Sequence, residues 1–407
     1  MSDSQHNQSS SSSSKQQWET LKFEPFHSRA TEAFWHQLSH LKLTEIMLSA
    51  DGTDHLPLAA EFSTGGRYSE ISSNIHLSRD SFLPFNKEKP EAVPQLTSNT
   101  PFSFVARGSL VLTNTIEAFQ KLSIVELTQQ IGKRIYDAIV GGEFLKNPNC
   151  IFQFVVKAFA NLKKWKFYYW FTFPSLMPNT TIQTVKNGVE SILDLLDLSQ
   201  QADVYNAMKK SRLNLKTSTM TNEIDIFFLI CVDNSTKAAG IDKIENYLER
   251  KKTAEVYFAF ADASALAANP GWALRNYLVA INYHFPNDIQ KVICYREVPT
   301  EDAPISRSIV LTVRLEKSKQ SILPDKFEDV RKVIGWEKNK KGLNKPKMLN
   351  LGTKMDPIKL SETSTSLNLN LMKWRMFPQL KSETLNATKC LLVGAGTLGC
   401  HVARNLM

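Results

Sequence analysis

The chain has 407 residues, which is longer than the roughly 250 to 300 residues beyond which a single hydrophobic core tends to divide. Hydrophobic residues make up 42% and charged residues 22%, a balance that permits buried cores and excludes a chain that is disordered throughout. The formal net charge of +9 leaves nucleic acid, an acidic membrane surface and an acidic protein as candidate partners.

Neither a membrane anchor nor a disulfide or zinc framework is predicted. The sequence has no run of about 18 apolar residues for a transmembrane helix, and the Ser/Gln-rich residues 1–17 lack the apolar segment of a secretory signal. The five cysteines are widely spaced and include no CxxC pair. We therefore expect a reducing, cytoplasmic setting, and we expect residues 1–17 to be disordered because a polar tract buries too little surface.

The region after the polar tail is predicted to mix helices and strands. Residues 33–41 have the apolar spacing of an amphipathic helix, with Ser28 as a candidate cap and Glu32 in its first turn. From residue 43 to about residue 108, short apolar runs separated by glycine and proline predict short strands and long loops. Residues 115–139 repeat apolar side chains at helical spacing, which predicts two helices.

An aromatic run at residues 166–174 follows a helix-like stretch at residues 151–162. The run is too short for a membrane helix and ends at a proline, so we interpret it as a buried strand. Stacking on nucleic acid bases is the alternative, but neighbouring residues of a strand point to opposite faces and do not form one platform. We therefore expect core packing and no nucleic acid partner.

Between residues 182 and 335 the predicted elements follow no regular order. Strands are expected at 224–232, 255–260, 291–295 and 309–313, and helix-like spans at 182–195, 241–248 and 272–283. Because strands and helices do not alternate with a fixed period, the sequence predicts an α+β amino-terminal domain over residues 18–335.

Residues 336–360 are predicted to be a basic linker. Seven lysines lie there, with glycine and proline between them: Lys338, Lys340, Lys341, Lys345, Lys347, Lys354 and Lys359. A solvated linker explains this composition, and a docking surface for an acidic partner is the alternative. Residues 361–376 are expected to form a short helix or an extended clamp.

The last residues hold the one chemical signature that we find in the sequence. The apolar run Cys390–Val393 is typical of a strand buried on both faces. Gly394, Gly396 and Gly399 follow at the GxGxxG spacing, which permits a tight turn, the close approach of a phosphate and close packing of the next helix. Such a strand-turn-helix unit favours a nucleotide site, because N–H groups at a helix amino terminus attract phosphate.

The spacing of the glycines decides neither whether this motif binds a nucleotide nor which nucleotide it would bind. A glycine-rich turn without function is the alternative to a nucleotide site. The spacing also does not choose among NAD, FAD and ATP, since the acidic residue expected about 20 residues onward lies beyond Met407.

Three segments near the carboxyl end resemble the start of the adenylation domain in the autophagy ubiquitin-like-modifier activating enzyme family. They are MDP at 355–357, LNLNLMKWR at 367–375 and KCLLVGAGTLGC at 389–400. Upstream segments resemble that family's amino-terminal domain in the same order: FEPF at 23–26 with FW at 34–35, ARG at 106–108 with NT at 114–115, KFYYWF at 166–171 and PGWALRN at 270–276. The resemblance runs from about residue 20 to the end of the chain.

This resemblance implies both a fold and an activity. In such enzymes ATP with Mg²⁺ adenylates the carboxyl-terminal glycine of a ubiquitin-like modifier, and a cysteine then captures the acyl group as a thioester. The amino-terminal domain recruits the conjugating enzymes that receive it. Residues 361–407 would begin a Rossmann-like α/β adenylation domain, with Gly394, Gly396 and Gly399 in the ATP site. The implied location is the cytoplasm, including the preautophagosomal structure.

The family holds its catalytic cysteine, zinc-binding cysteines, cationic ATP-site groups and homodimer interface beyond the glycine motif. We therefore expect a truncated chain that binds conjugating enzymes, binds neither ATP nor Mg²⁺, and has no catalytic or metal-binding residue of its own. Ubiquitin-like modifiers and a homodimer partner would require the missing part. Cys400 is expected to be a packed small residue of the motif helix and not the thioester nucleophile.

Two other functions are considered. The same chain would be a competing binding module if it only sequestered conjugating enzymes. A dinucleotide-dependent oxidoreductase fragment is the other, and only the three glycines argue for it. Residues 270–276 are expected to form a Pro-Gly turn and a helix that buries Trp272 and Leu274. Direct contact with a partner is the alternative for this segment. Arg275 is a candidate for a structural ion pair.

Overall fold

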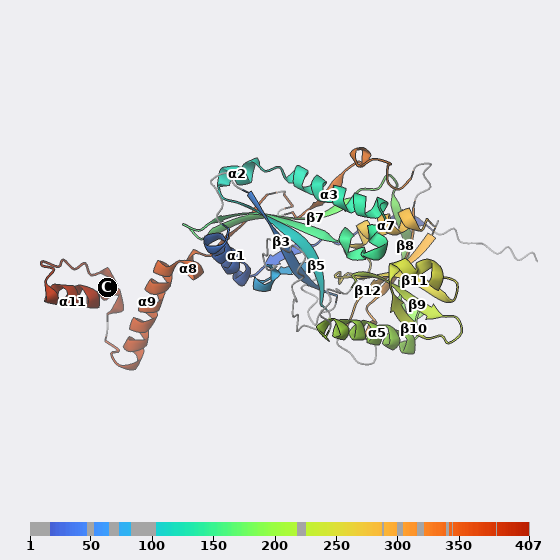
Figure 1. The fold of residues 1–407 in the computed structure, drawn as a ribbon. Coiled ribbons are helices and arrows are strands. Elements are labelled where there is room, and N and C mark those ends of the chain that lie inside the picture. The colour runs from blue at the N-terminus through green and yellow to red at the C-terminus, as the bar shows by residue number, and fades with distance from the viewer. Residues whose placement is uncertain are drawn as a thin grey trace, which may run out of the picture. The chain divides into compact units, whose positions relative to one another are not determined.

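The computed structural model divides into two compact units, one formed by residues 1–160 and 167–349 and the other by residues 161–166 and 350–407. The described residues are 17–46, 53–64, 73–82, 103–217, 225–286, 289–298, 304–315, 321–338, 342–343, 345–379 and 381–406 (Figure 1). The disorder expected for residues 1–17 falls almost entirely outside them.

The first sheet of the larger unit has seven strands in the order β1-β8-β13-β12-β11-β9-β10. They are β1 (Trp18–Thr20), β8 (Ile182–Ser191), β9 (Phe227–Asp233), β10 (Ala239–Asp242), β11 (Ala254–Ala261), β12 (Ile289–Tyr295) and β13 (Ile309–Leu315). Strands β11 and β12 run parallel, and the other pairs are antiparallel. A parallel pair needs a crossover connection, and helix α7 (Leu274–His284) supplies it.

The second sheet has eight strands: β14-β7-β6-β5-β3-β4-β2 in order, with β15 also paired to β7. They are β2 (His27–Ala30), β3 (Thr53–Ser63), β4 (Asn74–Leu77), β5 (Ser103–Thr113), β6 (Gln153–Asn161), β7 (Lys166–Leu176), β14 (Val333–Trp336) and β15 (Lys347–Asn350). The longest pairing joins β3 to β5, from Thr53 opposite Thr113 to Ser63 opposite Ser103.

Phe152 lies at the centre of an aromatic cluster that joins the two sheets. Its ring centroid lies 5.7 Å from that of Phe26, 5.4 Å from Phe62, 4.6 Å from Phe173 and 6.0 Å from Phe227. Phe227 belongs to the seven-stranded sheet, whereas Phe62 and Phe173 belong to the eight-stranded sheet. Full burial of a phenylalanine side chain contributes about 1.5–3 kcal/mol, so this cluster is a main source of cohesion between the sheets.

Asn276 of α7 supplies a polar link between the same layers. Its side-chain amide donates to the carbonyl oxygens of Ile151 and Pro174, both at 3.0 Å, and its oxygen accepts from Leu176 N at 3.0 Å. Asn276 is buried, and these hydrogen bonds satisfy its side chain.

Seven helices accompany the sheets in the described part of the larger unit. They are α1 (Glu32–Thr44), α2 (Ile116–Lys121), α3 (Ile124–Val140), α4 (Glu143–Lys146), α5 (Leu198–Thr217), α6 (Tyr247–Arg250) and α7. In α3, Leu127, Ile131, Ile135 and Ile139 recur every fourth residue and are buried, as expected for one apolar face of a helix.

Most of the long elements agree with the sequence predictions. Two helices, α2 and α3, occupy residues 115–139, and the aromatic run at 166–174 lies within strand β7. The four strands predicted between residues 224 and 313 correspond to β9, β11, β12 and β13, and the helix predicted at 272–283 corresponds to α7.

Two helix-like predictions are wrong. Residues 151–162 form mainly strand β6, and residues 182–195 form mainly strand β8. Both spans contain the β-branched residues Val and Ile, and each has neighbouring strands to pair with, so sheet formation overrides a weak helical spacing. The span 241–248 holds the end of β10, a 3-10 turn and the start of α6.

The predicted cap of α1 is also wrong. Thr31 caps the helix, with its hydroxyl accepting from Phe34 N at 3.3 Å. Ser28 lies in strand β2 instead. A threonine directly before the helix is better placed to reach the free N–H groups of the first turn.

Part of the predicted basic linker is ordered as strand. Lys347–Asn350 forms β15 and pairs with β7, so a plain linker does not describe these residues. Upstream, the register of β14 against β7 shifts around Gly335, whose φ is +141°. A Cβ at Gly335 would lie 1.9 Å from the carbonyl oxygen of Phe173, so only glycine fits this close approach. The domain limits stay a prediction.

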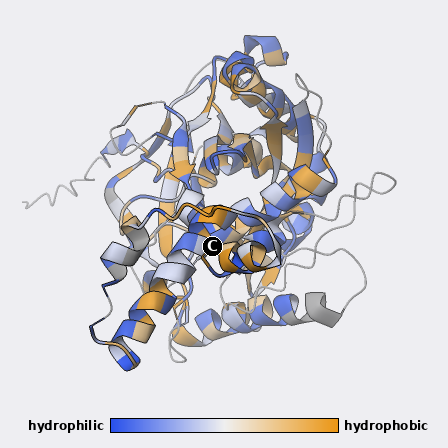
Figure 2. Cartoon of the chain, turned by 90° about the vertical axis from the view of Figure 1, so that its left-hand side faces the viewer, coloured by the Kyte–Doolittle hydropathy of each residue, from blue (hydrophilic) through white to orange (hydrophobic). Residues whose placement is uncertain are grey.

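The smaller unit is helical. It contains α8 (Gly352–Met355), α9 (Pro357–Arg375), α10 (Ser382–Ala387) and α11 (Thr397–Leu406). The span 361–376, expected as a helix or a clamp, therefore lies in a helix, which Asp356 caps by accepting from Ile358 N at 3.0 Å. Apolar side chains such as Trp374 and Leu398 are exposed here, and Figure 2 shows orange segments along α9 and α11.

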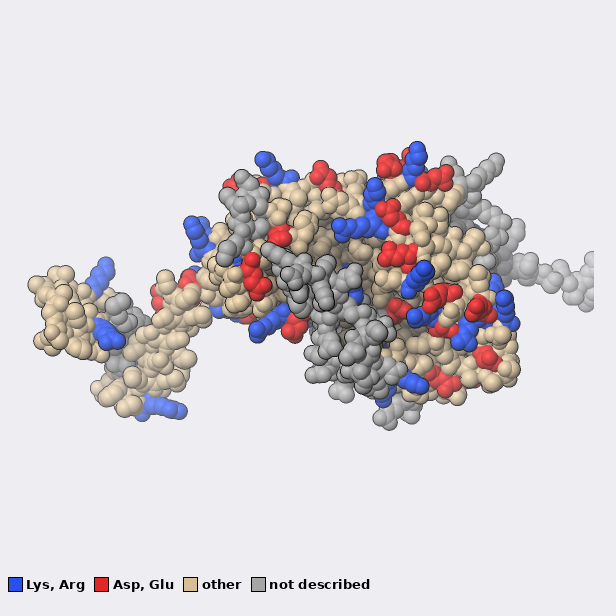
Figure 3. Space-filling model, in the orientation of Figure 1, with Lys and Arg blue, Asp and Glu red and all other residues tan. Residues whose placement is uncertain are grey.

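The surface of the larger unit carries charges of both signs. Acidic and basic side chains are interspersed over the larger unit on the face drawn in Figure 3, which does not resemble the continuous basic stripe of a nucleic acid binding groove. Within the described part of the chain, no helix combines the length and the apolar character that crossing a bilayer requires.

Candidate functional sites

The predicted glycine motif forms its turn and its helix. Gly394 has a φ of +107°, and α11 starts three residues later at Thr397. A Cβ at Gly399 would lie 2.2 Å from the carbonyl oxygen of Gly394, so the third glycine is needed for the close approach of helix and turn. At Gly396 a Cβ would meet nothing within 4 Å, which leaves open space beside the backbone.

The strand expected before this turn is missing. Residues 390–393 have no strand pairing, and Leu391 and Val393 are 90% and 89% exposed. The apolar run Cys390–Val393 therefore does not form a buried strand in this structure. A parallel strand forms only beside a neighbour, and none of the described strands pairs with this segment.

Cys400 also differs from its prediction. Its thiol is exposed and donates to the carbonyl oxygen of Ala395 at 3.3 Å, so it is not packed in a core. Nothing in this contact activates a nucleophile.

The turn leaves room for a phosphate contact. Glycine at 394 and 396 leaves the backbone open to an anion. Among the described residues, however, no group of three or more His, Cys, Asp or Glu side chains is placed to hold a metal ion. The role of Gly394, Gly396 and Gly399 in nucleotide binding stays a prediction.

A second candidate site lies where the parallel strands β11 and β12 end. Ligands often bind beside the carboxyl ends of parallel strands. Asp262 directly follows β11, and Arg296 and Glu297 directly follow β12. All three side chains are buried. None of these three residues was predicted as a site residue, although charged residues directly after apolar strands were a usable signal.

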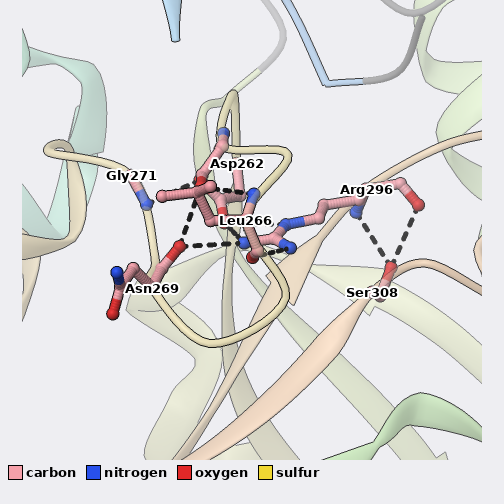
Figure 4. Close-up of polar contacts among 7 residues, drawn as sticks. Asp262, Leu266, Asn269, Gly271, Arg296 and Ser308 are labelled. Carbon is pink, nitrogen blue, oxygen red and sulfur yellow. Dashed lines mark hydrogen bonds and ion pairs between the residues drawn. The ribbon is translucent and has the colours of Figure 1, made fainter. Parts of the chain in front are cut away.

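Asp262 and Arg296 form a buried ion pair, as Figure 4 shows. Arg296 Nε donates to Asp262 Oδ2 at 3.0 Å and a terminal nitrogen donates to the same oxygen at 2.7 Å. The other carboxylate oxygen accepts from the backbone N–H groups of Ser264 at 3.0 Å and Gly271 at 2.9 Å. Burial raises the pKa of Asp262, and Arg296 and these N–H groups oppose that rise.

The same arginine fixes the loop that follows β11. Its terminal nitrogens donate to the carbonyl oxygens of Leu266 at 2.7 Å and Asn269 at 3.3 Å. A Cβ at Gly271 would lie 2.5 Å from the Asp262 carboxylate, so the backbone must come close at this point. Residues 262–271, which we call the braced loop, are thus held at both ends by one ion pair.

Glu297 is paired in the same manner. Two terminal nitrogens of Arg212, from α5, donate to its carboxylate at 2.9 and 2.6 Å. The Arg212 guanidinium also lies 4.8 Å from the ring centroid of Phe104. Both carboxylates of the cluster are therefore neutralised by guanidinium groups, and neither is free for acid–base catalysis. The two ion pairs therefore have a structural role at the ends of β11 and β12.

Arg275 lies just beyond the braced loop and is bound differently. Its guanidinium carbon lies 4.9 Å from the ring centroid of Phe23 and 4.7 Å from that of Trp272. The backbone holds these rings in place, because Glu24 N donates to Pro270 O at 2.8 Å and Trp272 Nε1 donates to Phe173 O at 3.0 Å. Trp272 is half-buried, whereas Leu274 is buried as expected.

The structural ion pair considered for Arg275 is absent from the described part of the chain. Its Nε is buried and has no hydrogen-bond acceptor there. Burial lowers the pKa of Arg275, as expected for a cation without a carboxylate beside it.

The sequence profile of a family described as "Ubiquitin-like modifier-activating enzyme ATG7 N-terminus" matches residues 21–355. The chain belongs to this family. The resemblance stated from the motifs is therefore confirmed, and the matched span contains most of both sheets. Nothing in the comparisons supports the oxidoreductase alternative.

Full-length relatives agree with the ATG7 assignment. The ubiquitin-like modifier-activating enzyme atg7 of Dictyostelium discoideum is 34% identical over 398 residues, which cover 95% of this chain and 54% of that protein. The ATG7 of Homo sapiens is 32% identical over 391 residues, which cover 95% of this chain and 52% of that protein. The chain thus spans about half the length of the curated relatives it matches.

Solved ATG7 structures have the same α+β fold. The crystal structure of the Kluyveromyces marxianus Atg7NTD–Atg10 complex matches with a TM-score of 0.54 at 23% identity, over 83% of this chain and 99% of that chain. The Kluyveromyces marxianus Atg7NTD alone matches with a TM-score of 0.54 at 23% identity, over 81% of this chain and 98% of that chain. The predicted α+β amino-terminal domain is confirmed at this level.

Proposed function

We propose that the larger unit recruits autophagy conjugating enzymes to a ubiquitin-like modifier-activating enzyme. The observation that carries the proposal is the ATG7 N-terminus match over residues 21–355, which coincides with the unit that holds both sheets. Further support comes from the Kluyveromyces marxianus Atg7NTD, whose fold is similar and which forms a complex with Atg10.

The residues described above suit recruitment better than catalysis. In the cluster at the ends of β11 and β12, each carboxylate is held by a guanidinium group. What this arrangement produces is a rigid loop beside an aromatic-clamped arginine, and rigid, pre-formed surfaces bind partners at a lower entropic cost.

We further propose that residues 1–407 alone do not adenylate a modifier. ATP and Mg²⁺ would serve the whole activating enzyme, with Gly394, Gly396 and Gly399 contributing only a phosphate contact. Adenylation also requires a metal ion and cationic groups to stabilise the transferring charge, and we propose that other parts of the enzyme supply them. Modifier binding and homodimer formation are likewise assigned to other parts of the enzyme.

Two measurements test these proposals together. Isothermal titration calorimetry of the 407-residue chain with the Atg10-type conjugating enzyme of the same organism should give saturable binding. ATP–pyrophosphate exchange by the chain, with added modifier and Mg²⁺, should stay at background while a full-length relative exchanges. Absent binding contradicts recruitment, and measurable exchange contradicts the proposal that these residues are inactive in adenylation.

For localisation we propose the cytoplasm, including the preautophagosomal structure, because conjugating enzymes of this pathway would be met there. A fluorescent fusion of the chain that stays away from autophagosome formation sites during starvation would contradict the second half of this proposal.

A further inference from the structure

Arg275 differs from Arg296 and Arg212 in what its guanidinium contacts. Arg296 and Arg212 each bind a carboxylate of this chain, Asp262 and Glu297 respectively. Arg275 contacts two aromatic faces instead, and within the described residues no carboxylate or carbonyl oxygen accepts from it. Partial desolvation of a cation without an acceptor costs free energy. An anion bound to Arg275 would offset this cost.

The two rings determine which edge of the guanidinium is available. Phe23 and Trp272 lie against it at 4.9 and 4.7 Å, while Nε is buried. No hydrogen bond joins the terminal N–H groups to another described residue, and the Arg275 side chain is only partly buried, so an external acceptor would approach this edge. A planar guanidinium edge matches the two oxygens of a carboxylate in a bidentate pair.

The position of this arginine is fixed before any partner arrives. The braced loop is anchored by the Asp262–Arg296 pair, and Trp272 follows it directly, with its indole N–H held by Phe173 O at 3.0 Å. On the other side, the bridge between Glu24 and Gly271 holds the segment that carries Phe23. A donor fixed in this way loses little side-chain entropy on binding.

We propose that Arg275, clamped between Phe23 and Trp272, receives a carboxylate from an acidic segment of the recruited conjugating enzyme. This inference rests on the proposed recruitment function and adds the chemistry of one contact to it. The chain as a whole carries a net charge of +9, so an acidic partner segment is also favoured by long-range attraction.

The test compares two variants of Arg275 with a matched control in the full 407-residue chain. Arg275→Gln removes the charge, and Arg275→Lys keeps the charge but loses the planar edge. Arg314→Gln is the control, because Arg314 also stacks on an aromatic ring, that of Trp18 at 4.0 Å, while it donates to Gln183 at 3.1 Å. Calorimetry with the Atg10-type enzyme at low and high salt gives the dissociation constants.

We expect Arg275→Gln to weaken binding at least about tenfold, because loss of one partner of a desolvated charge pair mainly raises the dissociation rate constant. Arg275→Lys should weaken binding by less, because it keeps the charge. Arg314→Gln should bind as the parent chain does. The salt dependence of binding should become shallower for Arg275→Gln alone. A charge swap should restore affinity: Arg275→Glu combined with the matching Asp or Glu of the partner changed to Lys.

The failures are distinguishable. If the parent chain does not bind the enzyme, recruitment itself is wrong, and this inference falls with it. If the parent chain binds and Arg275→Gln binds equally well, recruitment stands and the carboxylate contact is wrong. If Arg275→Gln lowers the melting temperature, the charge swap decides, because a purely structural arginine would not be rescued by a change in the partner. Loss of parent binding after phosphatase treatment of the partner would also overturn a carboxylate.

Discussion

Ser28 and Glu337 join the two ends of the eight-stranded sheet, although 309 positions separate them in the sequence. Ser28 N donates to one carboxylate oxygen of Glu337 at 3.0 Å, and the Ser28 hydroxyl donates to the other at 2.6 Å. Lys347 of β15 binds the same carboxylate. Strand β2 is the outer strand at one end and β14 at the other, so this contact caps an N–H group of an open sheet edge.

Glu337→Gln should destabilise the larger unit by roughly 1–3 kcal/mol, because it weakens buried hydrogen bonds to a charged acceptor. Burial raises the pKa of Glu337, but hydrogen bonds from His27, Lys347 and Ser28 outweigh it and lower that pKa below its usual value of 4.5. Urea unfolding of both chains at several pH values measures the effect.

The sign of the pH dependence follows from that lowered pKa. The contribution of Glu337 is complete above pH 4.5 and is lost as the pH falls through the folded-state pKa. The stability difference between the parent chain and Glu337→Gln should therefore shrink in acid. The exposed Glu249→Gln serves as the control and should change little. A difference that stays constant down to pH 3 would contradict a stabilising carboxylate at Glu337.

Asp262→Asn should destabilise the larger unit by about 3–5 kcal/mol, because it leaves the buried Arg296 without its counter-charge. Glu190→Gln is the matched control. It removes an exposed ion pair in which Lys291 Nζ lies 3.1 Å from Glu190 Oε2. The loss in the free energy of unfolding should be under about 1 kcal/mol. Equal losses for the two variants, measured by urea unfolding, would contradict the bracing role of Asp262.

Lys157 should titrate in a range where lysines are normally charged. Its ammonium donates to Leu122 O at 2.7 Å and lies 4.4 Å from the Phe119 ring centroid, and burial lowers its pKa to about 8. From about pH 8 to pH 10.5 the unfolded chain holds the proton that the folded chain has lost, so this group favours folding more as the pH rises.

The variant Lys157→Met isolates this effect, since methionine keeps an unbranched apolar stem without a titrating group. The stability of the parent chain relative to Lys157→Met should increase between pH 7 and pH 10, as measured by urea unfolding at each pH. An unchanged difference would mean that Lys157 keeps an ordinary pKa. Lys291→Met, at an exposed position, controls for general effects of alkaline solution.

Gly399→Ala should disturb the glycine turn far more than Gly396→Ala. The first Cβ would lie 2.2 Å from Gly394 O, whereas the second would meet nothing within 4 Å. Amide hydrogen exchange in α11 should therefore rise more in Gly399→Ala, while protection in the larger unit stays unchanged in both variants. Equal exchange in the two variants would show that the close approach of turn and helix does not persist in solution.

The sequence predicted long, strongly patterned elements well. Helix α3 and strand β7 were recognisable because one face, or a continuous aromatic run, carries the apolar residues. Strands β6 and β8 were mistaken for helices, since a short apolar span does not reveal whether neighbouring strands are available to pair with it.

The polar contacts were harder to foresee. Ser28 could be seen as a helix cap, and its true partner, Glu337, is set by sheet order and not by local spacing. Similarly, Asp262 and Arg296 are 34 positions apart and meet only because β11 and β12 are parallel neighbours. At the glycine motif, the turn and helix follow from local backbone preferences, whereas the strand depends on a partner that spacing does not supply.

The capping of β2 by a residue so far along the chain also sets an order of events during translation. At about 5–20 residues per second, the 309 positions between Ser28 and Glu337 take roughly 15 to 60 s to synthesise. For that interval the nascent polypeptide carries an uncapped strand edge next to the ribosome, and such edges template association with other unfinished chains. We therefore expect the yield of correctly folded protein to fall when this strand edge is left unshielded during synthesis.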